Sequence, residues 1–417
     1  MLMNQVVSFA LAADSIDSMP NLVDLQKADD PRDLIHRAVQ ALAEGHVIAL
    51  PTETVYTLAA SGLNAGATKK LLDLRRGDPD AVFALAVRST EAVLDFTCSL
   101  SPLADRFATR CWPGPLTLKL TCDQRESALT QLPELVRGLV QAADGSVGFR
   151  VIDHRVFQTL HQFIAAPIVL TSASLAGQPP ATTAEDVAAR FGDQLPLIIS
   201  DGPCRYSGPS TVVRVVGNLY DIMFEGAIER AAMRQFSKPI VAVVCTGNTC
   251  RSPMAEALLR ERLRQKTGSE DSVLVVSAGV AAMPGSSAAQ QAVQVMSRRG
   301  LDLTGHGSRP LDERLVGLAD LILTMTKQHA AAILARWPEL GDRVRPLRHD
   351  GQDISDPVGA PVEVYDACAA QIDQELELWV EIMSEHGWLD TAEVSRGEAS
   401  SAALPNKPND DTNRRTS

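Results

Sequence analysis

The chain has 417 residues, of which 45% are hydrophobic, 22% charged and 4% aromatic, and its formal net charge is −12. This length exceeds what one hydrophobic core usually serves, so we expect two domains. The acidic charge disfavours a protein that holds nucleic acid by its phosphate backbone, and the scarcity of aromatic residues disfavours a base-stacking platform. We therefore expect no strong direct binding to nucleic acid.

The sequence shows no signal for export or for membrane insertion. The first residues include a short apolar patch without a basic region, and no apolar run reaches the length of a membrane span. The seven cysteines are scattered and odd in number, which is typical of a reducing compartment. We predict a cytoplasmic protein that does not contact membranes.

The first half of the chain predicts a mixed α/β domain. Residues 1–33 show no sustained periodicity and are expected to form a loosely ordered extension, and residues 34–232 are expected to form the domain. A helical pattern covers residues 31–44. Short apolar runs predict strands at 46–51, 83–87, 116–122, 167–172, 196–200 and 210–216.

The second half predicts a regular alternation of strands and helices over residues 240–390, after a short linker at 233–239. Strands are expected at 240–244, 272–278, 319–325 and 343–347, and helices at 253–266, 286–299, 327–336 and 362–386. Such alternation implies a parallel sheet covered on both faces, with a ligand site at the carboxyl ends of its strands. Residues 391–417 lack apolar content and predict a disordered tail.

The segment from Cys245 to Ser252 reads CTGNTCRS and carries the clearest chemistry. It joins an apolar strand to a helix opened by Pro253, and the amides and dipole of such a junction bind anions. A cysteine at the start of this loop ionises readily, and an arginine six positions later can grip two phosphate oxygens. We therefore predict that Cys245 is a nucleophile and that Arg251 binds phosphate.

A cysteine that attacks phosphorus needs an acid that protonates the leaving group. Asp356 is the best candidate, because Pro357 follows it and restricts the loop. Asp353 is the rival acid, and a turn aspartate without catalytic role is the other interpretation. His306, His329 and His349 lack the spacing of metal ligands and are expected to be solvated or core residues.

Residues 239–388 resemble the low-molecular-weight protein phosphatases. The resemblance rests on the CTGNTCRS loop, the SAG tripeptide at 277–279 and the Asp356–Pro357 pair, followed by a terminal helix. It implies a four-stranded parallel sheet with flanking helices and metal-independent, cofactor-free hydrolysis of phosphorylated protein side chains through a phosphocysteine. It also implies that Arg251 stabilises the equatorial oxygens and that Asp356 protonates the leaving group and then activates water. The remaining loop residues are expected to shape the site and bind phosphate: Thr246, Gly247, Asn248, Thr249, Cys250 and Ser252.

Within this family the loop is most similar to that of the bacterial protein-arginine phosphatases. Thr249 matches the position that favours phosphoarginine in that subgroup, whereas Val358 stands where the family usually has a substrate-flanking aromatic residue. Phosphotyrosine and phosphoarginine both stay open as substrates. Cys250 is either a partner for a reversible disulfide with Cys245 or an inert small residue.

Several segments of the first half resemble the YrdC-type threonylcarbamoyl-adenylate synthases over residues 35–232. They are PTETVY at 51–56, WPGPLTL at 112–118, VGFRV at 147–151, TSASLAGQP at 171–179 and GPSTVV at 208–213. The resemblance implies a mixed, twisted open sheet that binds ATP with Mg, threonine and bicarbonate and serves the threonylcarbamoyladenosine modification of tRNA. It assigns ligand binding to Thr52, Tyr56, Arg75, Thr117, Arg150, Ser172, Ser174 and Ser210.

This N-terminal site departs from the pattern of its family. The family has a lysine and an arginine one residue apart where this chain has Arg75 and Gly77, and Ser174 replaces an asparagine. Each lost cationic donor removes a charge-assisted hydrogen bond worth about 1.5–3 kcal/mol, although Arg76 or Arg150 could compensate. Two hypotheses therefore stay open: either both halves are enzymes, or the first half is a non-catalytic nucleotide-binding or regulatory module beside an active phosphatase.

Overall fold

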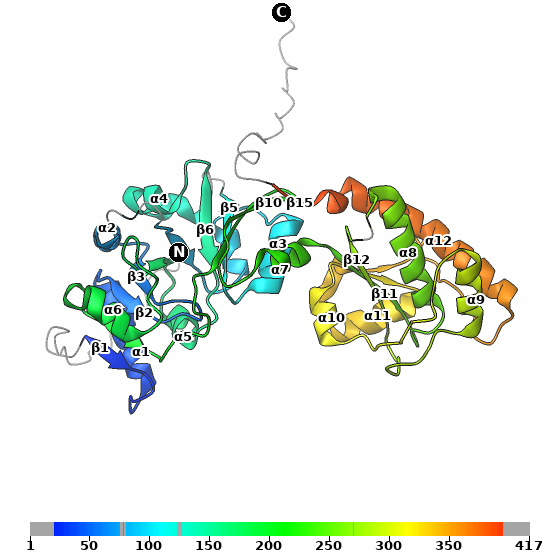
Figure 1. Cartoon of the computed structure of the whole chain (residues 1–417), viewed down its shortest axis with the longest axis horizontal. Coiled ribbons are helices and arrows are strands. Elements are labelled where there is room, and N and C mark those ends of the chain that lie inside the picture. The colour runs from blue at the N-terminus through cyan, green and yellow to red at the C-terminus, as the bar shows by residue number, and fades with distance from the viewer. Residues whose placement is uncertain (1–20, 76–77, 79–80, 123–126, 270, 395–417) are drawn as a thin grey trace, which may run out of the picture. The chain divides into compact units, whose positions relative to one another are not determined.

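The computed structural model describes residues 21–394, with gaps at 76–77, 79–80, 123–126 and 270. The described chain forms two compact units (Figure 1). The first unit contains the described residues up to Ser99 together with Cys111–Arg214 and Met223–Glu229. The second contains Leu100–Arg110, Val215–Ile222 and the described residues from Arg230 onward. The units therefore do not follow the predicted boundaries at 232 and 240, because two segments of the first half group with the second.

Eleven strands of the described chain form one mixed sheet. In spatial order they are β1 (Leu22–Asp24), β8 (Ile198–Ser200), β2 (Ile48–Leu50), β3 (Thr57–Ser61), β7 (Ile168–Ser172), β4 (Ala84–Ala86), β6 (Ser146–Arg150), β5 (Leu116–Thr121), β9 (Thr211–Val216), β10 (Leu219–Phe224) and β15 (Ala392–Glu393). The pairs β2–β3, β3–β7, β4–β7 and β5–β6 are antiparallel, whereas β1–β8, β2–β8 and β4–β6 are parallel. The predicted mixed sheet is thus confirmed.

Helices cover this sheet with apolar faces. They are α1 (Pro31–Ala43), α2 (Ala65–Leu74), α3 (Pro102–Cys111), α4 (Glu134–Val140), α5 (Arg155–Phe163), α6 (Ala184–Phe191) and α7 (Arg230–Ser237), with short 3₁₀ turns at Glu91–Asp95, Ala128–Gln131 and Gly192–Gln194. Helix α1 begins where the Asp30 side chain accepts a hydrogen bond from the Arg32 amide. Its buried residues recur every three or four positions, which presses one face against the sheet: Ile35, Ala38, Ala41 and Leu42.

Three boundary predictions need correction. Residues 22–24 were expected to lie in a loose extension but form β1, because their backbone pairs with β8. The expected linker at 233–239 is helical as far as Ser237, as the end of α7. Residues 392–393 of the expected tail form β15, which pairs with β10. Residues 1–20 of the predicted extension and 395–417 of the predicted tail lie outside the described residues.

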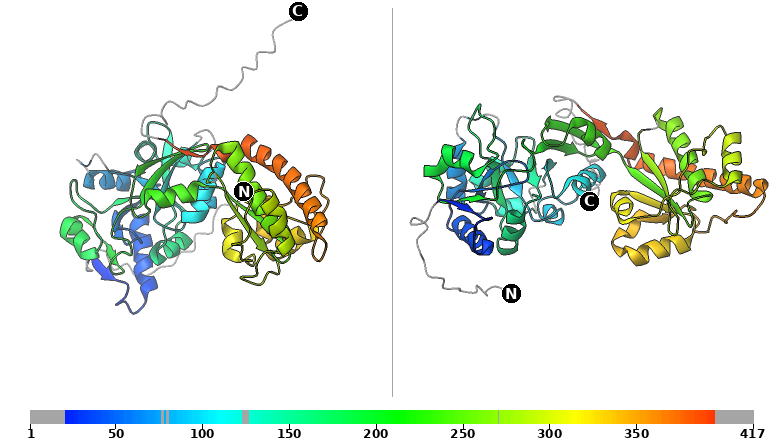
Figure 2. Two further views of the ribbon diagram at one scale, coloured as in Figure 1. Left: turned by 45° about the vertical axis from the view of Figure 1, so that its right-hand side comes forward. Right: turned by 60° about the horizontal axis from the view of Figure 1, so that its bottom comes forward.

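The second unit contains the predicted four-stranded parallel sheet. Its order is β12 (Leu274–Gly279), β11 (Ile240–Cys245), β13 (Leu321–Thr324) and β14 (Val344–Pro346). The flanking helices are α8 (Arg251–Thr267), α9 (Gln290–Arg298), α10 (Glu313–Leu318), α11 (Lys327–Arg336) and α12 (Val362–Glu385), with 3₁₀ turns at Pro338–Arg343 and Trp388–Asp390. The helices α8, α9 and α12 lie on one side of the sheet and α10 and α11 on the other, as a second pair of views also shows (Figure 2).

Strand β11 is buried on both faces because its side chains alternate between the two helical layers. Val241 and Val243 belong to the core formed with α8, α9 and α12, whereas Ala242 and Val244 belong to the core formed with α10 and α11. The strand ends at Cys245, so that residue lies at the carboxyl edge of the sheet, where parallel α/β folds place their ligands.

Candidate active site

The loop that joins β11 to α8, residues 245–252, is named the phosphate loop after its predicted ligand. Two of its residues contact the sulfur of Cys245. Cys245 is only 3% exposed. Its Sγ lies 3.3 Å from the amide nitrogen of Asn248 and 2.9 Å from the hydroxyl oxygen of Ser252. The sulfur of Cys245 is therefore held at the base of the loop by one backbone and one side-chain contact.

Asn248 holds the shape of the loop. Its φ of 54° makes it the one non-glycine residue of the described chain with a left-handed backbone, which carries a steric cost that the surroundings must balance. Its amide nitrogen Nδ2 donates to Ser252 Oγ at 3.0 Å, and its Oδ1 accepts from the amide of Arg309 at 2.8 Å. Its carbonyl oxygen accepts from His306 Nε2 at 2.7 Å. These contacts fix both the backbone and the side chain that orients Ser252.

Gly279, at the end of the SAG tripeptide, lets β12 approach the loop. A Cβ atom at this position would lie 2.4 Å from the carbonyl oxygen of Thr246 and 2.9 Å from the amide nitrogen of Asn248. Both are backbone atoms, which cannot swing aside as the end of a long side chain can. The glycine is therefore required by contact with the phosphate loop.

Arg251 is 4% exposed and forms the first residue of α8. Its Nη1 donates to the carbonyl oxygen of Ile354 at 3.0 Å, and its Nη2 donates to the carboxylate of Asp356. The Nε atom has no hydrogen-bond partner among the described residues. The guanidinium is thus held beside the loop with donor capacity left for an anion.

The structure separates the two candidate acids. The Asp356 side chain is 43% exposed and pairs with Arg251, and its Oδ1 accepts from the amide of Val358 at 3.2 Å. The carboxylate of Asp353 instead accepts from the amide of Lys327 at 2.8 Å, at the start of α11. Asp356 therefore lies beside Arg251, for which phosphate binding is predicted, whereas Asp353 accepts a hydrogen bond from a helix N-terminus.

The remaining predicted loop residues occupy different surroundings. Cys250 is buried, and its sulfur lies 3.3 Å from the hydroxyl of Tyr365, whose pKa is raised by burial. The carbonyl oxygen of Thr249 accepts from the amide of Ala289 at 2.8 Å. Val358 is 69% exposed, and as a valine it places no aromatic ring at the position where the family usually has one.

His329 is a neighbour of the loop that sequence reasoning missed. Its Nε2 lies 2.9 Å from the hydroxyl oxygen of Thr246, 83 positions away in the chain, and its side chain is buried with 7% exposed. Burial, and then the charge of Arg251, lower its pKa below the ordinary value of 6.5. The sequence predicted a solvated or core residue at this position. No local pattern could show that His329 of α11 contacts a loop residue 83 positions earlier in the chain.

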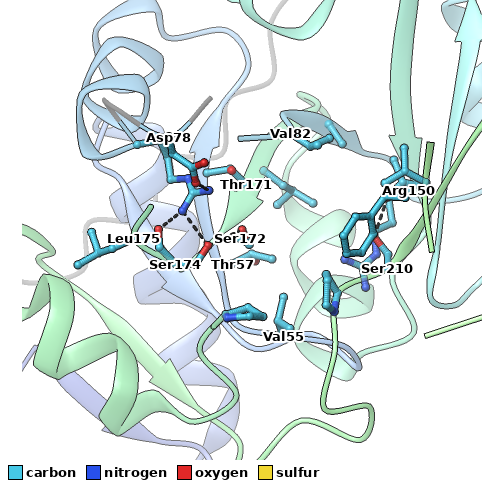
Figure 3. A pocket seen from close by; sticks show the side chains of 18 of the residues that line it. Val55, Thr57, Asp78, Val82, Arg150, Thr171, Ser172, Ser174, Leu175 and Ser210 are labelled. Carbon is cyan, nitrogen blue, oxygen red and sulfur yellow. Dashed lines mark hydrogen bonds and ion pairs between the residues drawn. The ribbon is translucent and has the colours of Figure 1, made fainter. Parts of the chain in front are cut away.

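The first unit contains a cavity of about 300 Å³ that gathers most of the residues predicted for its ligand site (Figure 3). Six of the eight predicted residues line it: Arg75, Thr117, Arg150, Ser172, Ser174 and Ser210. They come from β5, β6, β7, the loop after β7, the end of α2 and the loop before β9. Arg76, which was offered as compensation, and Gly77, which stands in place of the family's arginine, lie outside the described residues.

Both arginines of this cavity are already engaged. Arg75 is 5% exposed and donates to the carbonyl oxygen and the hydroxyl of Ser174 and to the carboxylate of Asp78. Burial lowers the pKa of Arg75, and Asp78 opposes that effect. Arg150 is 4% exposed, and its Nη2 donates to Glu53 at 2.8 Å and to the hydroxyl of Thr54 at 2.6 Å.

Hydroxyl groups supply the other polar contacts of the cavity. Ser172 and Ser174 lie 2.9 Å apart, as do the hydroxyls of Thr117 and Ser210. Thr171 is 3% exposed, and its hydroxyl has no partner among the described residues. The cavity therefore offers neutral hydroxyls and two arginines that are paired with carboxylates.

Thr52 and Tyr56 do not line the cavity. The Thr52 hydroxyl accepts from the amide of Val55 and donates to its carbonyl oxygen at 2.6 Å. The Tyr56 hydroxyl donates to the carbonyl oxygen of Gly202 at 2.8 Å, and burial raises the pKa of Tyr56 to about 12. Their hydroxyls thus bind nearby backbone, a role that a sequence motif does not distinguish from ligand binding.

The described residues contain no group of three or more His, Cys, Asp or Glu side chains that could hold a metal ion. The cavity thus offers no carboxylate cluster for the Mg²⁺ that would accompany ATP. Within the same part of the chain, every helix is too short or too polar to cross a lipid bilayer.

Comparison with known proteins identifies the two classes. A profile of the family described as "Low molecular weight phosphotyrosine protein phosphatase" matches residues 240–388. A profile of the Sua5/YciO/YrdC family, described as "Telomere recombination", matches residues 40–226. The chain belongs to both families, with a threonylcarbamoyl-AMP synthase-like domain followed by a phosphatase domain.

Individual relatives agree with this assignment. The protein-arginine-phosphatase of Geobacillus stearothermophilus is 40% identical over 35% of this chain and 93% of its own length. The threonylcarbamoyl-AMP synthase of Vibrio parahaemolyticus is 30% identical over 43% of this chain and 93% of its own length. The threonylcarbamoyl-AMP synthase of Bacillus subtilis is 29% identical over 53% of this chain, which spans 60% of that relative. The solved YwlE arginine phosphatase from Geobacillus stearothermophilus is 36% identical, covers 36% of this chain and 95% of its own, and superposes with a TM-score of 0.33.

Proposed function

We propose that the second domain hydrolyses phosphorylated protein side chains through a phosphocysteine at Cys245. The observation that carries this proposal is the buried sulfur, which accepts from the Asn248 amide at 3.3 Å and lies 2.9 Å from the Ser252 hydroxyl oxygen, next to a helix that begins with Arg251. The thiolate attacks phosphorus, an S–P bond forms, and the bond from phosphorus to the leaving group breaks. Asp356, as a carboxylic acid, gives its proton to the leaving group.

The second step returns the enzyme to its starting state. The Asp356 carboxylate takes a proton from water, the water oxygen attacks phosphorus, and the S–P bond breaks to release inorganic phosphate and the thiolate. The loop amides and Arg251 stabilise the charge on the equatorial oxygens in both steps, which is the role such preorganised donors play in acyl and phosphoryl transfer. The proposed chemistry needs no metal.

The substrate that we favour is protein phosphoarginine. Thr249 supports it, and so does the name of the relative that is 40% identical, a protein-arginine-phosphatase. Phosphotyrosine is the second candidate, because another relative, 39% identical, carries the name "Probable low molecular weight protein-tyrosine-phosphatase EpsP". A thiolate nucleophile requires a reducing compartment, and the seven cysteines are free, so we place the protein in the cytoplasm.

The decisive experiment compares phosphoarginine and phosphotyrosine peptides as substrates of the full chain and of Cys245→Ser. We expect release of inorganic phosphate from the unchanged protein and a loss of at least about 10³-fold in the variant, which still binds the peptide. Cys368→Ser is the matched control and retains activity. Undiminished turnover by Cys245→Ser would overturn the mechanism.

For the first domain we propose a ligand-binding module rather than an active synthase. A polyphosphate needs cationic donors, but the described arginines of the cavity are held by Glu53, Asp78 and Ser174. Breaking a buried ion pair leaves an uncompensated charge, at a cost of about 3–5 kcal/mol. The proposed occupants are those of the synthase family: ATP, threonine or bicarbonate.

Incubation of the full chain with ATP, Mg²⁺, threonine and bicarbonate tests this proposal. We expect no pyrophosphate above the level of a reaction without threonine, while equilibrium binding of at least one of the compounds is measurable. Pyrophosphate release that depends on threonine would instead establish the synthase, with a role in tRNA modification.

A further inference from the structure

His329 has three properties that the proposed phosphatase mechanism does not explain. Its ring is buried with 7% exposed, its Nε2 is bonded to the loop residue Thr246, and its Nδ1 is buried without a hydrogen-bond partner among the described residues. A buried polar atom without a partner is rare and calls for an explanation. His329 lies on α11, whose N-cap Thr326 accepts a hydrogen bond from the backbone amide of His329 at 3.1 Å. The first turn of α11 thus holds the backbone of His329, and the ring lies beside the loop residue Thr246.

The charges around this ring come from every element packed near it. Arg251 of α8 lowers the pKa of His329, while Asp353 and Asp356, from the loop that follows β14, raise it. The Cys245 thiol ends β11 one position before Thr246, and Lys327 stands on the same helix with its amide bonded to Asp353. Burial is the largest effect, so the empty site favours the neutral ring.

An oxyanion in the loop changes this balance. The oxyanion would pair with Arg251 and offset the positive charge that disfavours a protonated His329 ring. It would also add negative charge beside Thr246. Resting on the phosphatase function proposed above, we propose that His329 is a positioning residue that takes up one proton from solvent when an oxyanion fills the loop. The proton leaves again when the anion departs.

The hydrogen bond to Thr246 gives this proton a structural consequence. In the imidazolium both ring nitrogens are donors, so Nε2–H donates to the Thr246 oxygen. The hydroxyl hydrogen of Thr246 is then free for another acceptor, whichever tautomer the neutral ring had. Protonation thus adds a second cation near Arg251. Where the neutral ring accepts a hydrogen bond from the Thr246 hydroxyl, protonation also releases that hydroxyl as a donor at the phosphate loop.

The sign of the pH dependence follows from this linkage. The pKa of His329 is lowered in the empty site and rises when the anion binds, so anion binding takes up a proton between these two values. Anion affinity therefore increases as the pH falls through that window, and it is level above and below it. A rise of one pKa unit corresponds to about tenfold tighter binding at the acid end.

Sulfate is the probe, because it carries two negative charges at every pH from 5 to 8. The full chain with Cys245→Ser removes the titration of the nucleophile, and its sulfate affinity is measured by calorimetry across this range. We expect about tenfold tighter binding at pH 5 than at pH 8 and a slope that His329→Gln abolishes. His349→Gln, a substitution of the same kind at an exposed site, leaves the slope unchanged.

Nuclear magnetic resonance of the His329 ring protons gives an independent measurement that needs no change at that residue. We expect its pKa below 6.5 without sulfate and higher at saturating sulfate. A pH slope of sulfate binding that survives His329→Gln, or a ring pKa that sulfate leaves unchanged, would overturn the role of His329 alone. Failure of sulfate to bind at any pH would contradict the phosphate loop and with it the proposed phosphatase.

Discussion

The phosphate loop and the N-terminal cavity both contain buried arginines paired with carboxylates, but the carboxylates differ in freedom. Asp356, the partner of Arg251, is 43% exposed and lies on a loop. Asp78 and Glu53, the partners of Arg75 and Arg150, are 12% and 0% exposed. An exposed carboxylate can turn to water and leave its arginine to a phosphate, whereas a buried one would become an unpaired interior charge.

From this difference we predict that Arg251 serves a ligand and that Arg75 and Arg150 serve the fold. The position of each arginine in its helix supports the same prediction. Arg251 is the first residue of the helix that follows the phosphate loop. Arg75 is instead the C-cap of α2, and it donates a hydrogen bond to Ser174, which lies in the loop after β7. The ion pair itself therefore says little about function, and the exposure of its carboxylate is the feature that differs between the two sites.

Arg251→Lys should have the largest effect, because an ammonium cannot reproduce the planar fork that holds two phosphate oxygens. We expect kcat to fall by about 10²–10³-fold for all substrates, as for the loss of other preorganised donors. Arg262→Lys, farther along α8 and paired with Asp373, is the matched control with near-normal turnover. Equal activity of the two variants would contradict the distinction between the arginines.

Asp356→Ala should come next and should depend on the leaving group. General acid catalysis contributes about 10²–10⁴-fold, so hydrolysis of alkyl phosphates should slow by about 10²-fold or more. Nitrophenyl phosphate should slow far less, because nitrophenolate leaves without a proton. A loss of the same size for both substrates would point to another acid, and Asp353→Ala shows whether that acid is Asp353.

Arg75→Met tests the cavity arginine through stability rather than activity. Removing the guanidinium deletes its hydrogen bonds to Asp78 and Ser174, so we expect unfolding in urea to require about 1–3 kcal/mol less free energy. Arg205→Met breaks a surface ion pair with Asp153 and should cost about 0–1 kcal/mol. If Arg75→Met is as stable as the control but binds ATP more weakly, Arg75 serves a ligand.

Thr249→Ile should have the smallest effect and should act on selectivity. The larger apolar side chain removes a hydroxyl and narrows the entry, and such pocket changes are worth about tenfold. We expect the ratio of kcat/KM for phosphoarginine over phosphotyrosine peptides to fall by about that factor. An unchanged ratio would remove Thr249 as a determinant of the substrate.

The phosphate loop and its sheet were predictable because their determinants are local. A β-branched strand, a loop of small residues and Pro253 lie within 15 positions of one another, so strand, loop and helix follow in a fixed geometry. Alternation of strands and helices then implied the parallel sheet. In the first unit, strands β3 and β6 escaped prediction, because small residues and a glycine interrupt their apolar pattern.

Sequence alone determined the two families, the strand–loop–helix unit and the nucleophile with its arginine, because these depend on residues close together in the chain. Only the tertiary structure placed Asp356 beside Arg251 and Asp353 at the start of α11, brought His329 to Thr246 and turned the hydroxyls of Thr52 and Tyr56 toward backbone. Each of these outcomes is a hydrogen bond or ion pair whose partner is chosen by packing and whose alternatives look equal along the chain. Burial then made those choices costly to reverse.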